Sequence, residues 1–255
     1  MIGKRMEGLA MTDSSYEKYV RDEAFLAGYN DYQRRYATDI AERDKVMLGL
    51  VAEKRRGQGS LLDIGCSTGN LLLHLKRAFP DLQLTGGELA KSSLTAAIAN
   101  PELAGIEFRT MDMLDIDGQY DCITANAVTY LFRWPEYERA IQSIAKALKL
   151  GGTFISFDWF HPFEGQDLAI TEITEGHPEG LPIHARSYQR VARVFTKAGL
   201  DAVEFHPFFM PFDIPEPEDK SGTPVTYTVK QDNGNRLSFR GSLYQPWCHV
   251  TATKA

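Results

Sequence analysis

The sequence predicts an α/β fold in which a doubly wound, mostly parallel, seven-stranded sheet lies between layers of helices. Short apolar runs alternate with amphipathic helical patterns along most of the chain, which is typical of βαβ units. Because crossovers between parallel strands are right-handed, such units place helices on both faces of one sheet. The last apolar run follows a hairpin with no intervening helix, so we expect an antiparallel last strand.

The alternation begins at residue 60 and is punctuated by glycine and proline. Pro80, Asn100-Pro101, Gly151-Gly152 and Gly199 mark the ends of helical patterns. Strands are expected at residues 60–64, 82–85, 106–109, 120–124, 153–158, 203–208 and 243–253. Helices are expected at residues 70–79, 92–99, 135–148 and 184–198.

Three further segments complete the predicted organisation. Residues 1–57 are expected to form an N-terminal helical cap, because residues 13–56 contain no proline and read as helical. The remaining residues, 58–255, form the sheet domain. Within it, residues 159–183 hold three prolines and three glycines and are predicted to be a long loop that acts as a lid over a site. Residues 225–239 are predicted to form an added β-hairpin around Asn233-Gly234.

Composition excludes several classes of protein. The net charge of the 255-residue chain is -6, so it lacks the excess of basic residues that a nucleic-acid-binding domain needs. Its three cysteines have no disulfide or zinc spacing, and no grouping of metal-ligating residues predicts a metal site. No apolar stretch reaches about 18 residues and no signal peptide is visible, so we expect a cytoplasmic protein without membrane contact.

The segment that carries chemistry is LLDIGCSTGN, residues 61–70. An apolar strand ends near Asp63, and a loop containing Gly65 and Gly69 leads into a helix. Glycine allows a tight turn and a close approach of a ligand to the backbone. The first amides of the helix favour an anionic group, and ligands of open α/β sheets bind beyond the carboxyl ends of the strands.

Two acidic residues follow the next two strands. Glu88 lies about 20 residues beyond the glycines, where an acid accepts hydrogen bonds from ribose hydroxyls. Asp112, in FRTMDML, could accept a bond from an adenine amino group, while Met111 and Met113 offer apolar contacts to the ring. Taken singly, each pattern also fits a structural turn or a surface acid.

The ordered series resembles the motifs of class I, Rossmann-like S-adenosylmethionine-dependent methyltransferases. LLDIGCSTGN, LTGGELA and MDMLD look like the first three motifs, and YDCITANAVTYLF and LKLGGTFISFDWF look like the fourth- and fifth-strand regions. The resemblance covers residues 60–210 and departs at Ser67, where the commonest form has a glycine. It implies S-adenosylmethionine as the methyl donor, a small-molecule acceptor, and these donor-binding residues: Asp63, Gly65, Cys66, Ser67, Gly69, Glu88, Leu89, Asp112, Met113 and Asn126.

Candidate catalytic residues follow the fourth and fifth strands. His161 is the best candidate general base, because the ordinary pKa of histidine is near neutrality. Asp158 could orient His161 or bind substrate, and Tyr130 could line the acceptor pocket. The alternatives are that His161 packs in the loop, that Asp158 is a strand-end turn residue and that Tyr130 is a core aromatic. The cap carries Tyr16, Tyr19, Tyr29, Tyr32 and Tyr36, of which Tyr29, together with Arg34 or Arg35, could touch the methionine group or the substrate. The alternative is that the tyrosines pack one helix on another.

Other functions remain open from the sequence. A dinucleotide-dependent dehydrogenase is disfavoured, since the GxGxxG pattern is absent. A non-catalytic sensor or partner subunit would keep the same donor-binding residues. An RNA or protein methyltransferase is a third alternative, disfavoured for RNA by the acidic balance. A closed pocket suggests a small metabolite, and the general look of the chain favours a sugar or sugar nucleotide. The hairpin at residues 225–239 could support a homodimer.

Overall fold

The computed structural model describes residues 38–55, 57–175, 177–222 and 224–255, together with Leu26, Gly28, Asn30 and Gln33. The expectations for the N-terminal tyrosines, for Arg34 and Arg35 and for most of the helical cap lie outside the described residues. Within them, the predicted helical stretch that ends near residue 56 contains α3, Glu42–Lys54.

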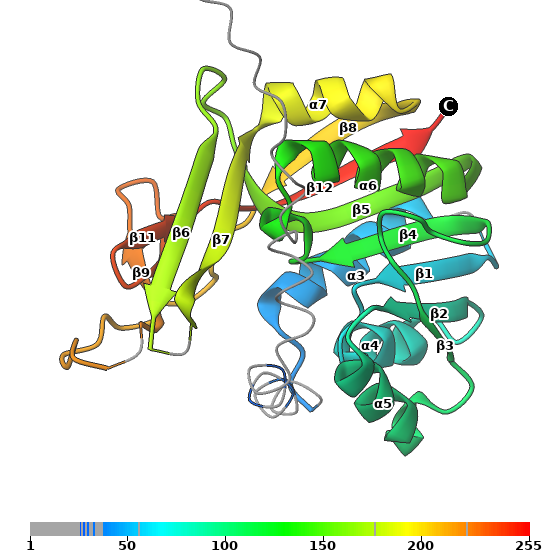
Figure 1. Cartoon of the computed structure of the whole chain (residues 1–255), viewed down its shortest axis with the longest axis horizontal. Helices are drawn as coiled ribbons and strands as arrows, with labels where there is room; N and C mark the ends of the chain where they lie inside the picture. The colour runs from blue at the N-terminus through cyan, green and yellow to red at the C-terminus, as the bar shows by residue number, and fades with distance from the viewer. Residues whose placement is uncertain are drawn as a thin grey trace, which may run out of the picture.

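The centre of the molecule is a twisted sheet with the strand order β3-β2-β1-β4-β5-β12-β8 (Figure 1). Strands β1 to β5 pair in parallel, and β12 runs antiparallel between β5 and β8. The predicted mostly parallel sheet of seven strands with an antiparallel last strand is therefore confirmed. The bounds are β1 Ser60–Ile64, β2 Gln83–Glu88, β3 Glu107–Thr110, β4 Tyr120–Asn126, β5 Leu148–His161, β8 Leu200–Pro207 and β12 Trp247–Lys254.

Helices cover both faces of this sheet. On one face, α6 (Trp134–Ala147) and α7 (Tyr188–Lys197) share a hydrophobic core with β4, β5 and β12. On the other, α3, α4 (Asn70–Ala78) and α5 (Lys91–Ala99) pack on β1, β2 and the side chains of Ile155 and Phe157 in β5. Two short turns of 3₁₀-helix, η2 (Pro101–Leu103) and η3 (Thr129–Leu131), follow α5 and β4. The layers leave the carboxyl ends of β1, β2 and β4 at one edge.

The prediction of a long loop at residues 159–183 is wrong. Strand β5 continues to His161, and β6 (Leu168–Thr174) and β7 (His177–Ser187) form a long antiparallel hairpin. Prolines suggested a loop, but an edge strand tolerates them because one of its sides needs no N–H donor. The helix expected from residue 184 begins later, at Tyr188, because the residues before it belong to β7 and pair with β5 and β6.

The C-terminal hairpin is confirmed and gains a third strand. Strands β9 (Thr226–Lys230), β10 (Arg236–Arg240) and β11 (Leu243–Gln245) form a separate antiparallel sheet beside the β6–β7 hairpin (Figure 1). The single strand expected at residues 243–253 is split at Pro246, after which β12 joins the central sheet. In the described part of the chain, no helix is long and apolar enough to cross a membrane.

Candidate active site

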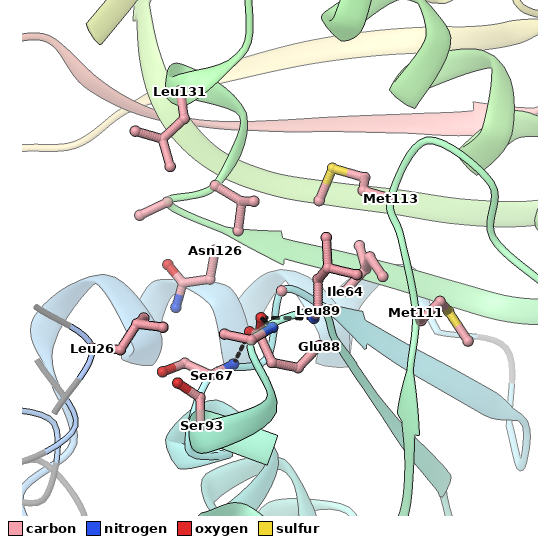
Figure 2. A pocket seen from close by; sticks show the side chains of 14 residues that line it. Leu26, Ile64, Ser67, Glu88, Leu89, Ser93, Met111, Met113, Asn126 and Leu131 are labelled. Carbon is pink, nitrogen blue, oxygen red and sulfur yellow. Dashed lines mark hydrogen bonds between the residues drawn. The ribbon is translucent and has the colours of Figure 1, made fainter. Parts of the chain in front are cut away.

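Two adjoining cavities open at the carboxyl ends of β1, β2 and β4. They share Gly65, Ser67, Asn126 and Ala127. The first cavity, drawn in Figure 2, is mostly apolar and is lined in addition by Leu26, Ile64, Glu88, Leu89, Ala90, Ser93, Met111, Met113, Val128 and Leu131. The second cavity is polar and is lined in addition by Gln33, Arg43, Asp44, Asp63, Cys66, Thr68, Asn70 and Leu71.

The glycine loop predicted from the sequence separates β1 from α4 at this edge. Gly65 has a φ of +75°, and its amide donates to the Gly87 carbonyl over 2.7 Å. A Cβ at this position would lie 2.6 Å from Cγ2 of Val128, so only glycine lets the loop after β4 approach this closely. Gly69, with a φ of +83°, begins α4, and its Cβ would meet Leu103 at 2.7 Å. Gly69 is therefore needed for packing and does not line either cavity.

Glu88 ties together the loops after β1 and β2. Its Oε1 accepts from the amides of Leu89 and Ala90, and its Oε2 accepts from the amide of Ser67, each over 2.8 Å (Figure 2). The side chain is buried, and burial raises its pKa above the ordinary value for glutamate. A carboxylate offers about four lone-pair positions, so three amides leave Glu88 with capacity for a further donor in the first cavity.

A buried polar chain lines the second cavity. Asp63 Oδ1 accepts from the Thr124 hydroxyl over 2.8 Å, and Asn126 Nδ2 donates to Asp44 Oδ1 over 2.7 Å. Both carboxylates are almost fully buried. Burial raises the pKa of Asp63 to about 7, and the charges of Asp44 and Glu88 add to this effect. Arg43 also lines this cavity, and its Nε lies 3.4 Å from Asp44 Oδ1. Asp63 is therefore the carboxyl group without a paired cation that would complement a cationic ligand.

Two buried oxygens of residues that line both cavities have no hydrogen-bond partner among the residues that the structure describes. These are the hydroxyl of Ser67 and Oδ1 of Asn126. More than nine in ten buried polar groups in proteins are paired. Unpaired oxygens on facing sides of one cavity therefore indicate positions that a ligand fills. Ser67, the departure noted in the first motif, has a φ of +50° and contributes one of these oxygens.

Comparison with known proteins agrees with the motif series. A family model described as a methyltransferase domain matches residues 61–152. The malonyl-[acyl-carrier protein] O-methyltransferase of Bacillus cytotoxicus is 32% identical over 208 residues, which cover 80% of this chain and 64% of that protein. The dTDP-3-amino-3,4,6-trideoxy-alpha-D-glucopyranose N,N-dimethyltransferase of Streptomyces venezuelae is 30% identical over 147 residues, 56% of this chain and 57% of that protein.

A solved structure has the same fold. The 1,6-didemethyltoxoflavin-N1-methyltransferase of Burkholderia thailandensis, solved with 1,6-didemethyltoxoflavin and S-adenosylhomocysteine, superposes with a TM-score of 0.59 at 13% identity, over 97% of this chain and 93% of that one. Residues 61–152 therefore match a methyltransferase domain, and the chain as a whole has the fold of this methyltransferase structure. The chain spans about half to two thirds of the length of most of the curated relatives that it matches.

Most of the donor-binding residues expected for a methyltransferase line the two cavities. Asp63, Gly65, Cys66, Ser67, Glu88, Leu89, Met113 and Asn126 are all wall residues. Asp112 is not among them: its Oδ1 accepts from the Leu114 amide over 2.9 Å, while Met111 and Met113 on either side line the first cavity. Whether Asp112 contacts an adenine stays a prediction.

The side chain of Asp158, a candidate catalytic residue, is already engaged in hydrogen bonds within the protein. This buried carboxylate accepts from the amides of Thr129, Tyr130 and Trp159 and from the Thr129 hydroxyl. Arg186, also buried, donates from the opposite side to the carbonyls of Thr129 and Phe132. Asp158 and Arg186 thus hold η3, whose neighbours form part of the cavity wall. Asp158 has no hydrogen bond to His161 in the described structure.

The other two candidates, His161 and Tyr130, line neither of the two described cavities. His161 ends β5 and pairs with Ser187 of β7, and burial lowers the pKa of its imidazole. Tyr130 stacks on Trp159 with ring centroids 6.1 Å apart, and the next residue, Leu131, lines the first cavity. A role for either residue in catalysis stays a prediction.

Sequence reasoning missed the contribution of α3 and of residues before it. Asp44 lies three and seven residues before Met47 and Val51, so it shares their buried face of α3. This helical spacing could have predicted a buried acid. Gln33 lines the second cavity and accepts from Asn70 Nδ2, and Leu26 lines the first. Those contacts join segments that are distant in sequence, so no local sequence pattern predicts them.

Proposed function

We propose that this chain transfers a methyl group from S-adenosylmethionine to an oxygen or nitrogen atom of a small molecule. The observation that carries the proposal is the pair of unpartnered buried oxygens, on Ser67 and Asn126, between an apolar cavity and an acidic one. The apolar cavity suits an adenosyl group and the acidic cavity suits a methionine group with its ammonium. The relatives that carry methyltransferase names support the same chemistry.

In this proposal the chain's own residues bind the donor at three places. Glu88 accepts from a ribose hydroxyl, because its side chain faces the first cavity and retains capacity for one further donor. Leu89, Met111 and Met113 enclose the adenine and keep water out. Asp63 and Asp44 face the ammonium end. When bound, S-adenosylmethionine supplies an electrophilic methyl carbon.

The protein's contribution to rate is then mostly orientation. Methyl transfer is an in-line displacement, and holding two reactants in line supplies much of the catalysis. The walls of the two described cavities hold carboxylates but no histidine. We therefore assign no general base inside the donor site and keep His161 as a candidate only for the acceptor side.

Donor binding is expected to strengthen as pH rises through the pKa of Asp63, which lies at about 7. The ammonium of the ligand's methionine group is that of a free amino acid, whose pKa lies above that of a peptide N-terminus, so it stays charged in this range and favours the ionised carboxylate. Between about pH 6 and pH 7.5, the ionised fraction of Asp63 and hence the affinity for S-adenosylhomocysteine should rise about eightfold. Calorimetric titrations at several pH values measure this.

The Asp63→Asn variant should bind S-adenosylhomocysteine more weakly at pH 7.5 and show a flat pH profile. Asp117→Asn, at an exposed side chain outside both cavities, is the matched control and should behave like the parent. A parent protein whose affinity does not change over this range would contradict ammonium recognition by Asp63.

Turnover separates an enzyme from a non-catalytic sensor, the main alternative. The purified protein would be incubated with S-adenosylmethionine and a panel of amino sugars, sugar nucleotides, phenols and heteroaromatic amines, and S-adenosylhomocysteine formation would be followed by chromatography. Product that depends on one acceptor class supports the proposal. Tight donor binding without product from any member of the panel would favour the sensor, and product only with RNA or protein would favour the third alternative.

Other expectations remain proposals. The Streptomyces venezuelae relative, whose name specifies a nucleotide-linked amino sugar, supports the sugar-nucleotide acceptor suggested by the sequence. We propose a cytoplasmic location on the strength of the three buried, unpaired cysteines, which are usual in a reducing compartment. We also propose that the acidic chain acts without nucleic acid or membrane partners and that the exposed hairpins could support a homodimer.

A further inference from the structure

An aromatic wall of Tyr130, Trp159 and Trp247 lies beyond the carboxyl ends of β4 and β5. The rings of Tyr130 and Trp159 are stacked with centroids 6.1 Å apart. Trp247, directly opposite Trp159 in the β5–β12 register, meets both rings edge-on at 5.5 and 6.1 Å. The wall also contacts apolar side chains of β7 and β11, namely Leu181, Ile183, Ala185 and Leu243.

This aromatic wall begins where the donor cavity ends. Ala127, which lines both cavities, donates its amide to the Phe157 carbonyl over 2.7 Å. Trp159 lies two residues further along β5 and therefore on the same face of the sheet as Phe157. Leu131, the neighbour of Tyr130, lines the first cavity and shares a hydrophobic cluster with Trp159. A molecule on the wall would thus adjoin the donor.

One polar atom in the wall lacks a partner. The indole N–H of Trp159 is buried, in a residue that is only 2% exposed, and it has no hydrogen-bond acceptor in the described part of the chain. Leaving such a donor unpaired is costly, and buried tryptophan N–H groups usually find a partner. The N–H therefore marks a place for an acceptor atom of a ligand.

The described surroundings of the wall lack a cation that could bind phosphate. Arg186 is committed to the carbonyls of Thr129 and Phe132 and packs on Tyr137 and Trp134. Arg240 forms an ion pair with Glu172, with Nε and Oε1 3.5 Å apart, which offsets its charge although this Nε has no hydrogen-bond partner among the described residues. Recognition of a nucleotide diphosphate depends on free arginine or lysine side chains, and the described part of this region offers aromatic and aliphatic groups instead.

We propose that the aromatic wall is the acceptor site and that it takes an uncharged, planar ring. The ring packs against half-buried Tyr130, and one of its oxygen or nitrogen atoms accepts from the Trp159 N–H. This proposal rests on the proposed methyltransferase function, and it replaces the sugar nucleotide suggested by the sequence with a phenol or heteroaromatic acceptor.

Binding of a simple ring probe tests the assignment. The protein saturated with S-adenosylhomocysteine would be titrated with 2-naphthol by calorimetry, and with dTDP as the nucleotide probe. Trp159→Phe keeps an aromatic ring but removes the N–H, and should weaken 2-naphthol binding about five- to tenfold. Tyr130→Ala should weaken it further. Trp134→Phe, on the far side of Arg186, is the matched control and should bind like the parent.

The outcomes separate this proposal from the proposed function. Failure of S-adenosylhomocysteine to bind the parent would overturn the donor site itself. With donor binding intact in all variants, a 2-naphthol affinity unaffected by Trp159→Phe and Tyr130→Ala would overturn the wall assignment alone. If dTDP binds more strongly than 2-naphthol and this binding is lost in Tyr130→Ala, the ring-acceptor assignment is wrong and the site takes nucleotide-linked acceptors.

Discussion

Replacing Asp158 with alanine is expected to lower the free energy of unfolding by about 3–5 kcal/mol, because it breaks a buried network of charged hydrogen bonds. The carboxylate accepts four hydrogen bonds, three of which come from η3, and its charge offsets that of buried Arg186. For a protein of this size the melting temperature should fall by about 10 °C. Thermal and urea unfolding of the parent and the variant measure the change.

Asp117→Ala, at an exposed aspartate, is the control and should unfold like the parent. The Asp158→Asn variant sharpens the comparison, since it keeps the shape of the side chain but replaces one accepting oxygen with a donor. An Asp158→Ala protein that is as stable as the parent and yet has lost turnover would show that the residue acts on the reacting groups and not through η3.

Replacing Glu88 with alanine is expected to weaken binding of S-adenosylmethionine and S-adenosylhomocysteine at least about tenfold, because one hydrogen bond to a charged acceptor contributes roughly 1.5–3 kcal/mol. The variant also loses the bonds from Ser67, Leu89 and Ala90 that shape the cavity. Calorimetric titration gives the affinities, and the melting temperature reports whether the fold persists.

Glu107→Ala on β3 serves as the matched control, since Glu107 is exposed, pairs with Arg109 and lines neither donor cavity. Its donor affinity should equal that of the parent. A Glu88→Ala protein that folds and binds either adenosyl ligand within a factor of about three of the parent would contradict ribose recognition by this carboxylate.

The donor side of the site was predictable because its signals are local. A strand, a glycine loop and a helix follow one another between residues 60 and 78, so Gly65 and Ser67 are placed by neighbours in sequence. Glu88 ends the next strand, and parallel pairing of β1 with β2 brings it to the same edge. Strand order and motif order together therefore determine this half of the site.

The acceptor side was predicted less well because its contacts are long-range. Asp158 looked like a partner for His161 in sequence, but the geometry of β5 turns it toward η3, 28 to 29 residues away. The hairpin of β6 and β7 was not predicted because its prolines suggested a loop. Trp247 contacts Trp159 because β12, the last strand in the sequence, pairs with β5. No period or spacing in the chain encodes those pairings.

The most direct test of the central claim is calorimetric titration of the parent protein with S-adenosylmethionine, S-adenosylhomocysteine and NAD. The structure predicts binding of both adenosyl ligands at about micromolar dissociation constants, near -8 kcal/mol, and no comparable binding of NAD. Absence of adenosyl binding, or a preference for NAD, would contradict the donor site and leave only the sheet architecture established.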